Sequence, residues 1–281
     1  MNFHYFGGRF NHNQIDMLED SLFSGVMFTY NPLQGDFFTK VARDIKLDKK
    51  IKYMIAIRAH TLSPQYLCMI NHAINDIMPE RLQINLLSGH IKPDEVNFEG
   101  LIDLVTDHSS NIDRSNYLIK YLEELDLMSK NSKIKVPDFY VTTSNKYVFE
   151  TTSRLNQKML IMYNTYVNRK WTEYVGHEPH LGDSFSLKNK QAMIVICPII
   201  RDSWEDIDKE FPLQPIMLPG GVQGMTRSAK TDESFFTKDQ FRQLMLKLES
   251  ENIHEVMVHG RTEEERAIII DFIKNYKKTY G

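Results

Sequence analysis

Two apolar runs decide the fold of this chain: IKYMIAIRAH, from Ile51 to His60, and RLQINLLSGH, from Arg81 to His90. Each run begins as a strand of apolar residues and ends in small or polar ones. A helix-like segment that starts at Ser63-Pro64 separates the two runs. In parallel α/β barrels the binding and catalytic residues lie at the carboxyl ends of the strands. The stretch therefore predicts two neighbouring barrel strands with a ligand site where they end.

Similar runs recur along the chain, rich in Ile, Val, Leu, Met, Phe and Tyr and with little alternation. Strands buried on both faces of a parallel sheet have this character. The predicted strands are Asn2–Phe6, Val26–Tyr30, Lys52–Arg58, Leu82–Ser88, Asp138–Thr143, Lys158–Tyr163, Ala192–Ile200 and Glu255–Val258. Helical patterns lie between them at Asn13–Ser24, Asp36–Lys46, Pro64–Met78, Ser115–Ser129, Lys238–Glu251 and Thr262–Tyr276.

Alternating strands and helices favour an α/β fold with a parallel sheet. The length of 281 residues is near that of an eight-stranded α/β barrel. Two segments are longer than a minimal strand–helix repeat requires, Ile91–Asp113 and Arg201–Thr237. Both would follow strands at the carboxyl rim of the barrel. We predict one domain over residues 1–281, a single (β/α)8 TIM barrel with long loops after strands 4 and 7.

Composition narrows the class of protein. Hydrophobic residues make up 42% and charged residues 25%, as in ordinary soluble proteins. The net charge of −3 argues against a general nucleic-acid binder, whose surface is basic. No apolar run reaches the length of a membrane span, and the segment Met1–Phe6 lacks the features of a signal peptide. Cys68 and Cys197 lie in apolar runs, which indicates buried thiols in a reducing compartment. We expect a cytoplasmic protein that binds neither nucleic acid nor membranes.

Polar residues near the strand ends are candidate ligand-binding residues. Thr142–Lys146 combines hydroxyls, the N–H groups of a helix start and a cation, which together can hold a phosphate. The same residue types are also common at a plain helix N-cap. Gly89, after Ser88, would let the backbone approach a ligand, or would simply end the strand in a turn. Asn85 lies within a strand and needs a hydrogen-bond partner if it is buried.

Histidines and arginines provide the candidates for chemistry. His60 and His90 end adjacent strands and could act as acid, base or hydrogen-bond partner near neutral pH, or be rim residues without catalysis. Arg227 and Arg261 are candidate anion ligands, or solvated surface charges. His177 and His180 have no convincing further ligands beside them, so we predict no metal site.

A series of short motifs follows in a fixed order along nearly the whole chain. The series comprises Arg58 with Ser63-Pro64, Arg81 with Asn85–Gly89, Lys92–Glu95, Asp107–Ser109, Phe139–Ser144, Ile199–Asp202 and His259-Gly260. In order and spacing it resembles the bacterial luciferase-like flavin monooxygenases, and among them the alkanesulfonate monooxygenase branch. The resemblance implies an eight-stranded barrel, usually a homodimer, that binds reduced flavin mononucleotide (FMN) at the carboxyl rim and uses O2. It also implies a small organic substrate and a separate flavin reductase as partners.

The resemblance extends to particular residues. It places the flavin phosphate at the segment after the fifth strand and the flavin edge at the end of the fourth. The implied cofactor-binding residues are Arg58, Ala59, Asn85, Ser88, Gly89, Thr142, Thr143, Ser144 and Asn145, and the candidate catalytic residues are His60, His90 and Arg227.

The chain also departs from that family. Gln34 stands where the alkanesulfonate branch has a cysteine, Val195 where it has a catalytic arginine, and Arg261 where it has a tyrosine. Tyr30–Pro32 stands where luciferases have a histidine. Sulfonate chemistry therefore does not carry over. The alternatives to an FMN-dependent monooxygenase are a flavin-binding barrel without turnover and a deazaflavin-dependent oxidoreductase.

Overall fold

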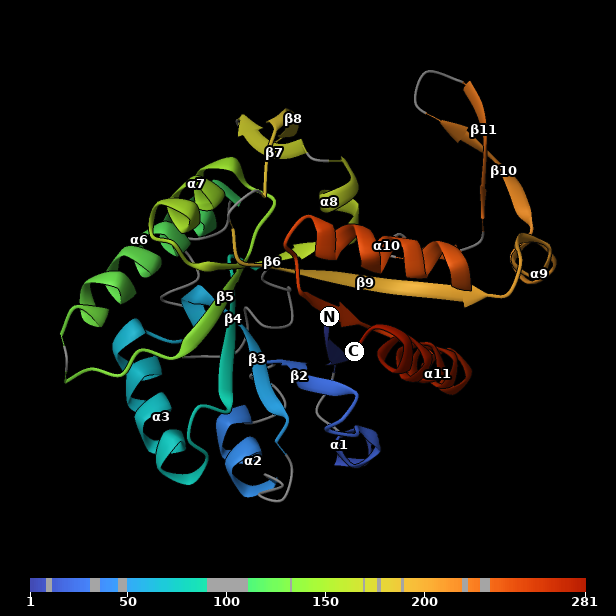
Figure 1. Ribbon diagram of the computed structural model, residues 1–281. Helices are drawn as coiled ribbons and strands as arrows, with labels where there is room; N and C mark the ends of the chain where they lie inside the picture. The colour runs from blue at the N-terminus through green and yellow to red at the C-terminus, as the bar shows by residue number, and fades with distance from the viewer. Residues whose placement is uncertain are drawn as a thin grey trace.

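A computed structural model describes residues 1–8, 12–30, 36–44, 50–89, 111–131, 133–168, 170–175, 178–187, 190–218, 222–227 and 233–281. Eight parallel strands close into a barrel, as predicted (Figure 1). β1 pairs with both β2 and β13, and β6 pairs with β9, so the barrel has no open edge. In barrel order the strands are β1 (Asn2–Gly8), β2 (Phe23–Thr29), β3 (Lys52–Arg58), β4 (Leu82–Leu87), β5 (Asp138–Thr142), β6 (Lys158–Met162), β9 (Ala192–Arg201) and β13 (Glu255–Val258).

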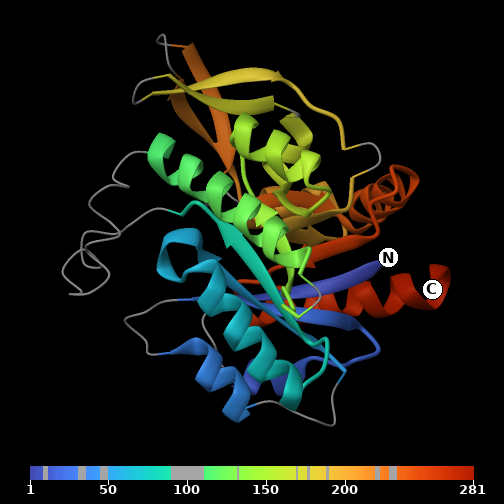
Figure 2. The same cartoon turned by 90° about the vertical axis from the view of Figure 1, so that its left-hand side faces the viewer.

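Helices cover the outside of the barrel (Figure 2). The predicted helices correspond to α1 (His12–Met17), α2 (Phe37–Asp44), α3 (Pro64–Ile77), α6 (Asn111–Ser129), α10 (Lys238–Ser250) and α11 (Glu263–Tyr280). Capping hydrogen bonds explain where several of these helices begin. The Ser63 hydroxyl accepts from the N–H of Tyr66, and Thr237 and Thr262 each begin a capping box. α7 (Lys146–Arg154), α8 (Tyr163–Asn168) and the 3-10 turn η2 (Ala59–Thr61) are additional elements.

The first predicted helix was too long. α1 ends at Met17, and the N–H groups of Leu22 and Phe23 both donate to the carbonyl of Glu19. This turn ends the helical path, and β2 begins directly after it at Phe23.

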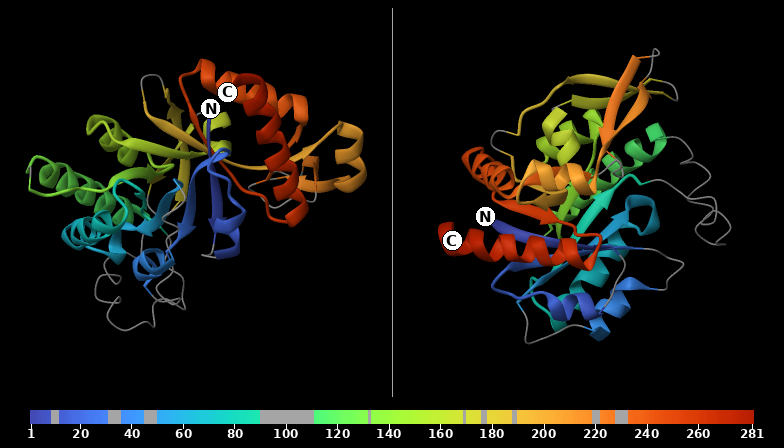
Figure 3. Two further views of the ribbon diagram at one scale, coloured as in Figure 1. Left: turned by 60° about the horizontal axis from the view of Figure 1, so that its bottom comes forward. Right: turned by 90° about the vertical axis from the view of Figure 1, so that its right-hand side faces the viewer.

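The segment predicted as a long loop after the seventh strand contains regular structure. It holds α9 (Trp204–Glu210), a hairpin of β10 (Leu213–Leu218) with β11 (Val222–Arg227), and β12 (Glu233–Thr237), which pairs in parallel with the carboxyl half of β9. Pro215 is compatible with β10, because a two-stranded hairpin leaves one side of each strand unpaired. A second hairpin, β7 (Lys170–Val175) with β8 (Glu178–Ser184), precedes β9. Both hairpins project from the barrel, and the chain ends lie close together (Figure 3). Residues 91–110 of the other predicted loop lie outside the described residues.

Apolar side chains form two separate clusters. The larger cluster lies between strands and helices, and the smaller one fills the barrel. The inner cluster consists of Met27, Met54, Ala56, Tyr140, Leu160, Met193, Val195 and Met257, with Phe6 and Leu87 packed against it. Side chains of a strand alternate between its faces, so residues two positions away from these also point inward. This alternation shows which polar residues at the two ends of the barrel point into its interior.

Candidate functional site

Three neighbouring strands bring polar residues together at the carboxyl mouth of the barrel. The register pairs Arg58 with Leu87 and Leu87 with Thr142, across β3, β4 and β5. The Thr142 hydroxyl donates to Asn85 Oδ1 at 2.7 Å, and Asn85 is only 3% exposed. Asn85 Nδ2 lies 3.6 Å from Met27 Sδ, and a thioether is a weak acceptor. Asn85 therefore presents a buried amide donor whose hydrogen-bonding capacity is only partly used.

Arg58 and Gly89 are packed against each other. Gly89 has φ +66, which favours glycine, and a Cβ there would lie 2.2 Å from Arg58 Cγ. The glycine thus lets the arginine stem cross the backbone at the end of β4. Ser88, beside it, is half-buried. This packing accounts for Gly89 by itself, and the expected approach of a flavin to this turn stays a prediction.

The predicted phosphate segment forms a helix cap. Asn145 Oδ1 accepts from the N–H groups of Tyr147 at 3.0 Å and Val148 at 3.2 Å, and starts α7. The Thr143 hydroxyl accepts from the N–H of Asn145 at 2.9 Å. These N–H groups are therefore bound by the chain's own side chains. A phosphate at this position would be held by the exposed Ser144 and by Lys146, the first residue of α7.

The candidate catalytic residues lie in different surroundings. His60 and Ala59 belong to η2 at the end of β3 and are buried, with 4% and 1% exposed. Arg227 ends β11, where it pairs with Leu213, and its side chain is outside the described part. His90 also lies outside the described residues. Of the three side chains, that of His60 lies within the described part, and the roles of all three stay predictions.

One residue outside the predicted set also lies at the mouth. His259 follows β13, and its Nδ1 lies 2.8 Å from the carbonyl oxygen of Phe6. Its ring meets the Phe6 ring edge-on, with centroids 5.1 Å apart. Burial lowers the pKa of the His259 imidazole; the Phe6 carbonyl opposes this shift, and the charge of Arg261 adds to it. The ring is therefore neutral at physiological pH.

The amino-terminal end of the interior holds a hydrogen-bonded polar network. Tyr140 donates to Glu255 Oε2 at 2.5 Å, and His4 Nε2 lies 3.7 Å from Glu255 Oε1. Asp138 accepts from Lys158 at 2.6 Å and from Gln83 at 2.8 Å. A cavity of about 290 Å³, lined in part by Lys158 and Glu255, opens at this end.

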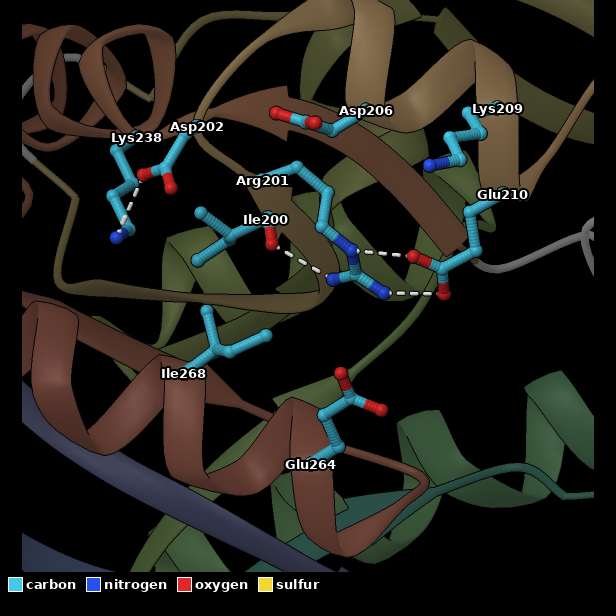
Figure 4. Close-up of a pocket in the computed structure, with 9 residues that line it drawn as sticks. All are labelled: Ile200, Arg201, Asp202, Asp206, Lys209, Glu210, Lys238, Glu264 and Ile268. Carbon is cyan, nitrogen blue, oxygen red and sulfur yellow. Dashed lines mark hydrogen bonds and ion pairs between the residues drawn. The ribbon is translucent and has the colours of Figure 1, made fainter.

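A larger cavity of about 540 Å³ lies outside the barrel, between the end of β9 and the helices α9, α10 and α11 (Figure 4). Arg201 forms a two-bond pair with Glu210 at 2.7 and 2.5 Å, and Lys238 pairs with Asp202 at 2.8 Å. These charges are satisfied by one another. We therefore interpret the cavity as a junction between helices, and the barrel mouth is the better candidate for a ligand site.

The described part of the chain holds neither a cluster of metal ligands nor a membrane-spanning helix. No group of three or more His, Cys, Asp or Glu side chains there could hold a metal ion. None of the helices described has the length and apolar character needed to span a bilayer. Cys68 and Cys197 are buried and not bridged, as predicted.

No protein-family model matches the chain, and no curated protein matches its sequence. Similar solved structures include EDTA monooxygenase from Chelativorans sp. BNC1, with TM-score 0.60 over 99% of this chain and 94% of that one. An F420-dependent secondary alcohol dehydrogenase in complex with an F420-acetone adduct gives 0.58 over 98% and 97%. Apo-MsnO8 gives 0.58 over 99% and 98%. Each of the three is 9% identical to this chain. The likeness establishes that this chain shares their barrel fold over nearly its whole length.

Proposed function

We propose that the barrel mouth binds a flavin-type cofactor and that the protein is a luciferase-like oxidoreductase. In its leading form it is an FMN-dependent monooxygenase that uses O2 on a small organic molecule. The observation that carries the proposal is the buried Asn85 amide, bonded to Thr142 at the mouth of this barrel, where Arg58 pairs with Leu87. Two of the similar structures are by name a monooxygenase and a dehydrogenase, which supports redox chemistry in this fold.

The residues at the mouth suit such a cofactor. Asn85 would donate to an acceptor on the flavin ring, because among the described residues its N–H groups meet only a thioether. Arg58, held over Gly89, supplies a positive charge at the same rim. Ser144 and Lys146 would contact the phosphate at the start of α7. When bound, the cofactor supplies the redox chemistry, and these residues bind and orient it.

Fluorescence titration of the purified protein tests the cofactor. FMN should bind saturably, and riboflavin, which lacks the phosphate, should bind more weakly. Ser144→Ala should weaken FMN binding by roughly 1–3 kcal/mol, the scale of hydrogen bonds to charged groups. Riboflavin binding should not change. Ser153→Ala, near the carboxyl end of the same helix, is the matched control and should bind like the wild type.

A deazaflavin tests the alternative cofactor. If a deazaflavin binds and FMN does not, the monooxygenase form of the proposal is wrong and a deazaflavin-dependent oxidoreductase takes its place. Turnover is tested by mixing reduced FMN and O2 with the protein. Oxidation at the rate of free FMN, despite binding, would mean a flavin-binding barrel without catalysis.

The expected homodimer and separate reductase belong to the same proposal. Sedimentation at micromolar concentration should give twice the chain mass of 33.0 kDa. A mass of one chain under those conditions would remove the dimer.

A further inference from the structure

His259 points into the barrel mouth. It lies two residues after Met257, which belongs to the inner cluster, and four after Glu255, which meets Tyr140 inside the barrel. The strand path continues as far as His259, because its N–H donates to the carbonyl of Ile196 at 3.1 Å. Alternation therefore places the imidazole on the inward face, one level above Met257.

The hydrogen bond to Phe6 fixes the state of the ring. A carbonyl oxygen only accepts, so the Nδ1 atom at 2.8 Å from it carries the proton. In the neutral ring Nε2 then holds a lone pair, and within the described part of the chain this atom has no hydrogen-bond partner. The charged groups around the ring are Arg261, Glu265 and Arg266.

Asn85 and His259 face each other across the mouth. β4 and β13 are four strands apart in the barrel order, in either direction around the eight-stranded ring. One side offers an amide donor, and the other offers an imidazole acceptor. A planar ligand that spans the mouth would thus meet a donor at one edge and an acceptor at the other.

We propose that His259 Nε2 accepts a hydrogen bond from the imide N–H of the bound flavin ring. This inference rests on the proposed function, since it names the contact that the same site makes with its cofactor. His259 is then a binding residue of the mouth, and the neutral Nδ1–H tautomer is the form that binds. Protonation of Nε2 at low pH removes the acceptor and weakens binding.

Nuclear magnetic resonance of the protein with ¹⁵N-labelled histidine tests the free state. The His259 ring should show the Nδ1–H tautomer and an apparent pKa below about 6.5. Bound FMN should shift its Nε2 signal. An Nε2–H tautomer in the free protein, or an Nε2 signal unmoved while flavin fluorescence reports binding, would overturn the inference.

A chemical double-mutant cycle tests the contact itself. His259→Asn removes Nε2, and N3-methyl-FMN removes the imide N–H. Each single change should weaken binding about two- to tenfold, the range of one neutral hydrogen bond, and the two together should weaken it little further. If the two losses of affinity multiplied when the changes were combined, a direct contact between His259 and the imide N–H would be contradicted. His254→Asn, at the exposed opposite end of β13, is the matched control and should bind like the wild type.

The pH arm uses the same variants. The FMN affinity of the wild type should fall as the pH drops through the pKa of His259, and that of His259→Asn should keep only the titration of the FMN phosphate. Identical pH profiles would overturn the inference and leave the proposed function standing. If the wild type binds neither FMN nor a deazaflavin, both fail.

Discussion

The two ends of the barrel interior are both polar, yet they use their polar groups differently. At the amino-terminal end both carboxylates are bound within the fold, because Asp138 accepts from two side chains and Glu255 accepts from Tyr140. The His4 ring and the Gln83 side-chain oxygen at that end make no hydrogen bond within the described part of the chain. At the mouth, within the same described part, Asn85 donates only to a thioether and His259 Nε2 has no partner. The bonded carboxylates stabilise the fold, whereas the amide and the imidazole of the mouth keep capacity for a ligand. In α/β barrels residues at the amino-terminal face serve stability and those at the carboxyl face serve function.

The largest effect on stability should come from the amino-terminal end. Tyr140 is 1% exposed, and its ring belongs to the inner cluster. Tyr140→Ala should lower the free energy of unfolding by roughly 3–5 kcal/mol, because it removes both the ring and the hydroxyl. Tyr140→Phe isolates the bond to Glu255 and should cost about 1–3 kcal/mol. Urea denaturation measures both, and a Phe variant as stable as the wild type would show that the network contributes nothing.

Acid should begin to destabilise the two ends at different pH values. Burial lowers the pKa of His259, so the unfolded chain binds protons first, and stability falls as the pH drops below about 6.5 toward the folded value. Burial alone would raise the pKa of Glu255, but the neighbouring His4 ring and the hydrogen bond from Tyr140 hold it below its ordinary value. The stability that Glu255 contributes is complete above about pH 4.3 and is lost as the pH falls through the lowered value.

Melting temperature against pH, for the wild type and two variants, separates these ranges. His259→Asn should flatten the upper part of the acid loss and Glu255→Gln the lower part. If Glu255→Gln alters the slope of the curve near pH 6, or His259→Asn leaves the slope there unchanged, the assignment of the two ends fails.

Asn85→Leu at the mouth should change the unfolding free energy by only about 1 kcal/mol in either direction. Residues placed for binding are often not optimal for stability, and the lost bond to Thr142 is offset by apolar contact with Met27. The same variant should weaken FMN binding. A loss of stability equal to that of Tyr140→Ala would mean that Asn85 is structural.

The smallest effect on stability is expected at Ser144. Its side chain is exposed and takes no part in the Asn145 cap, so Ser144→Ala should alter the unfolding free energy by no more than about 0.5 kcal/mol. Asn145→Ala should cost about 0.5–2 kcal/mol, because it removes the cap of α7. Thermal denaturation compares the two, and equal losses would contradict this division of roles.

The sequence predicted the barrel because its strands are runs of apolar residues of the right length and order. Because these runs are apolar throughout, the sequence does not show which residues of each strand point into the barrel. Met257 and Val258 are both fully buried, one inside the barrel and one against the helices. Nothing in such a run says which residues point inward, so His259 could not be assigned to the mouth.

Local chemistry explains other differences from the predictions. The Thr142–Lys146 segment predicts a helix start, and α7 begins there at the Asn145 cap. The extent of this helix is not evident from the sequence, because Thr151 and Thr152 are weak helix formers. The Thr142–Lys146 segment predicts both a helix cap and a phosphate site; the structure forms the cap, and the phosphate site stays a prediction. Thr142 with Asn85 was predicted as part of the cofactor rim, and the two are in direct contact.

Titration of FMN against the wild type, Asn85→Leu and His254→Asn tests most directly whether the mouth is a flavin site. The wild type and His254→Asn should quench FMN fluorescence with the same saturable affinity, and Asn85→Leu should bind more weakly while remaining folded. A protein that binds neither FMN nor a deazaflavin, or that binds with an affinity unaffected at Asn85, would contradict the assignment of the mouth as the cofactor site.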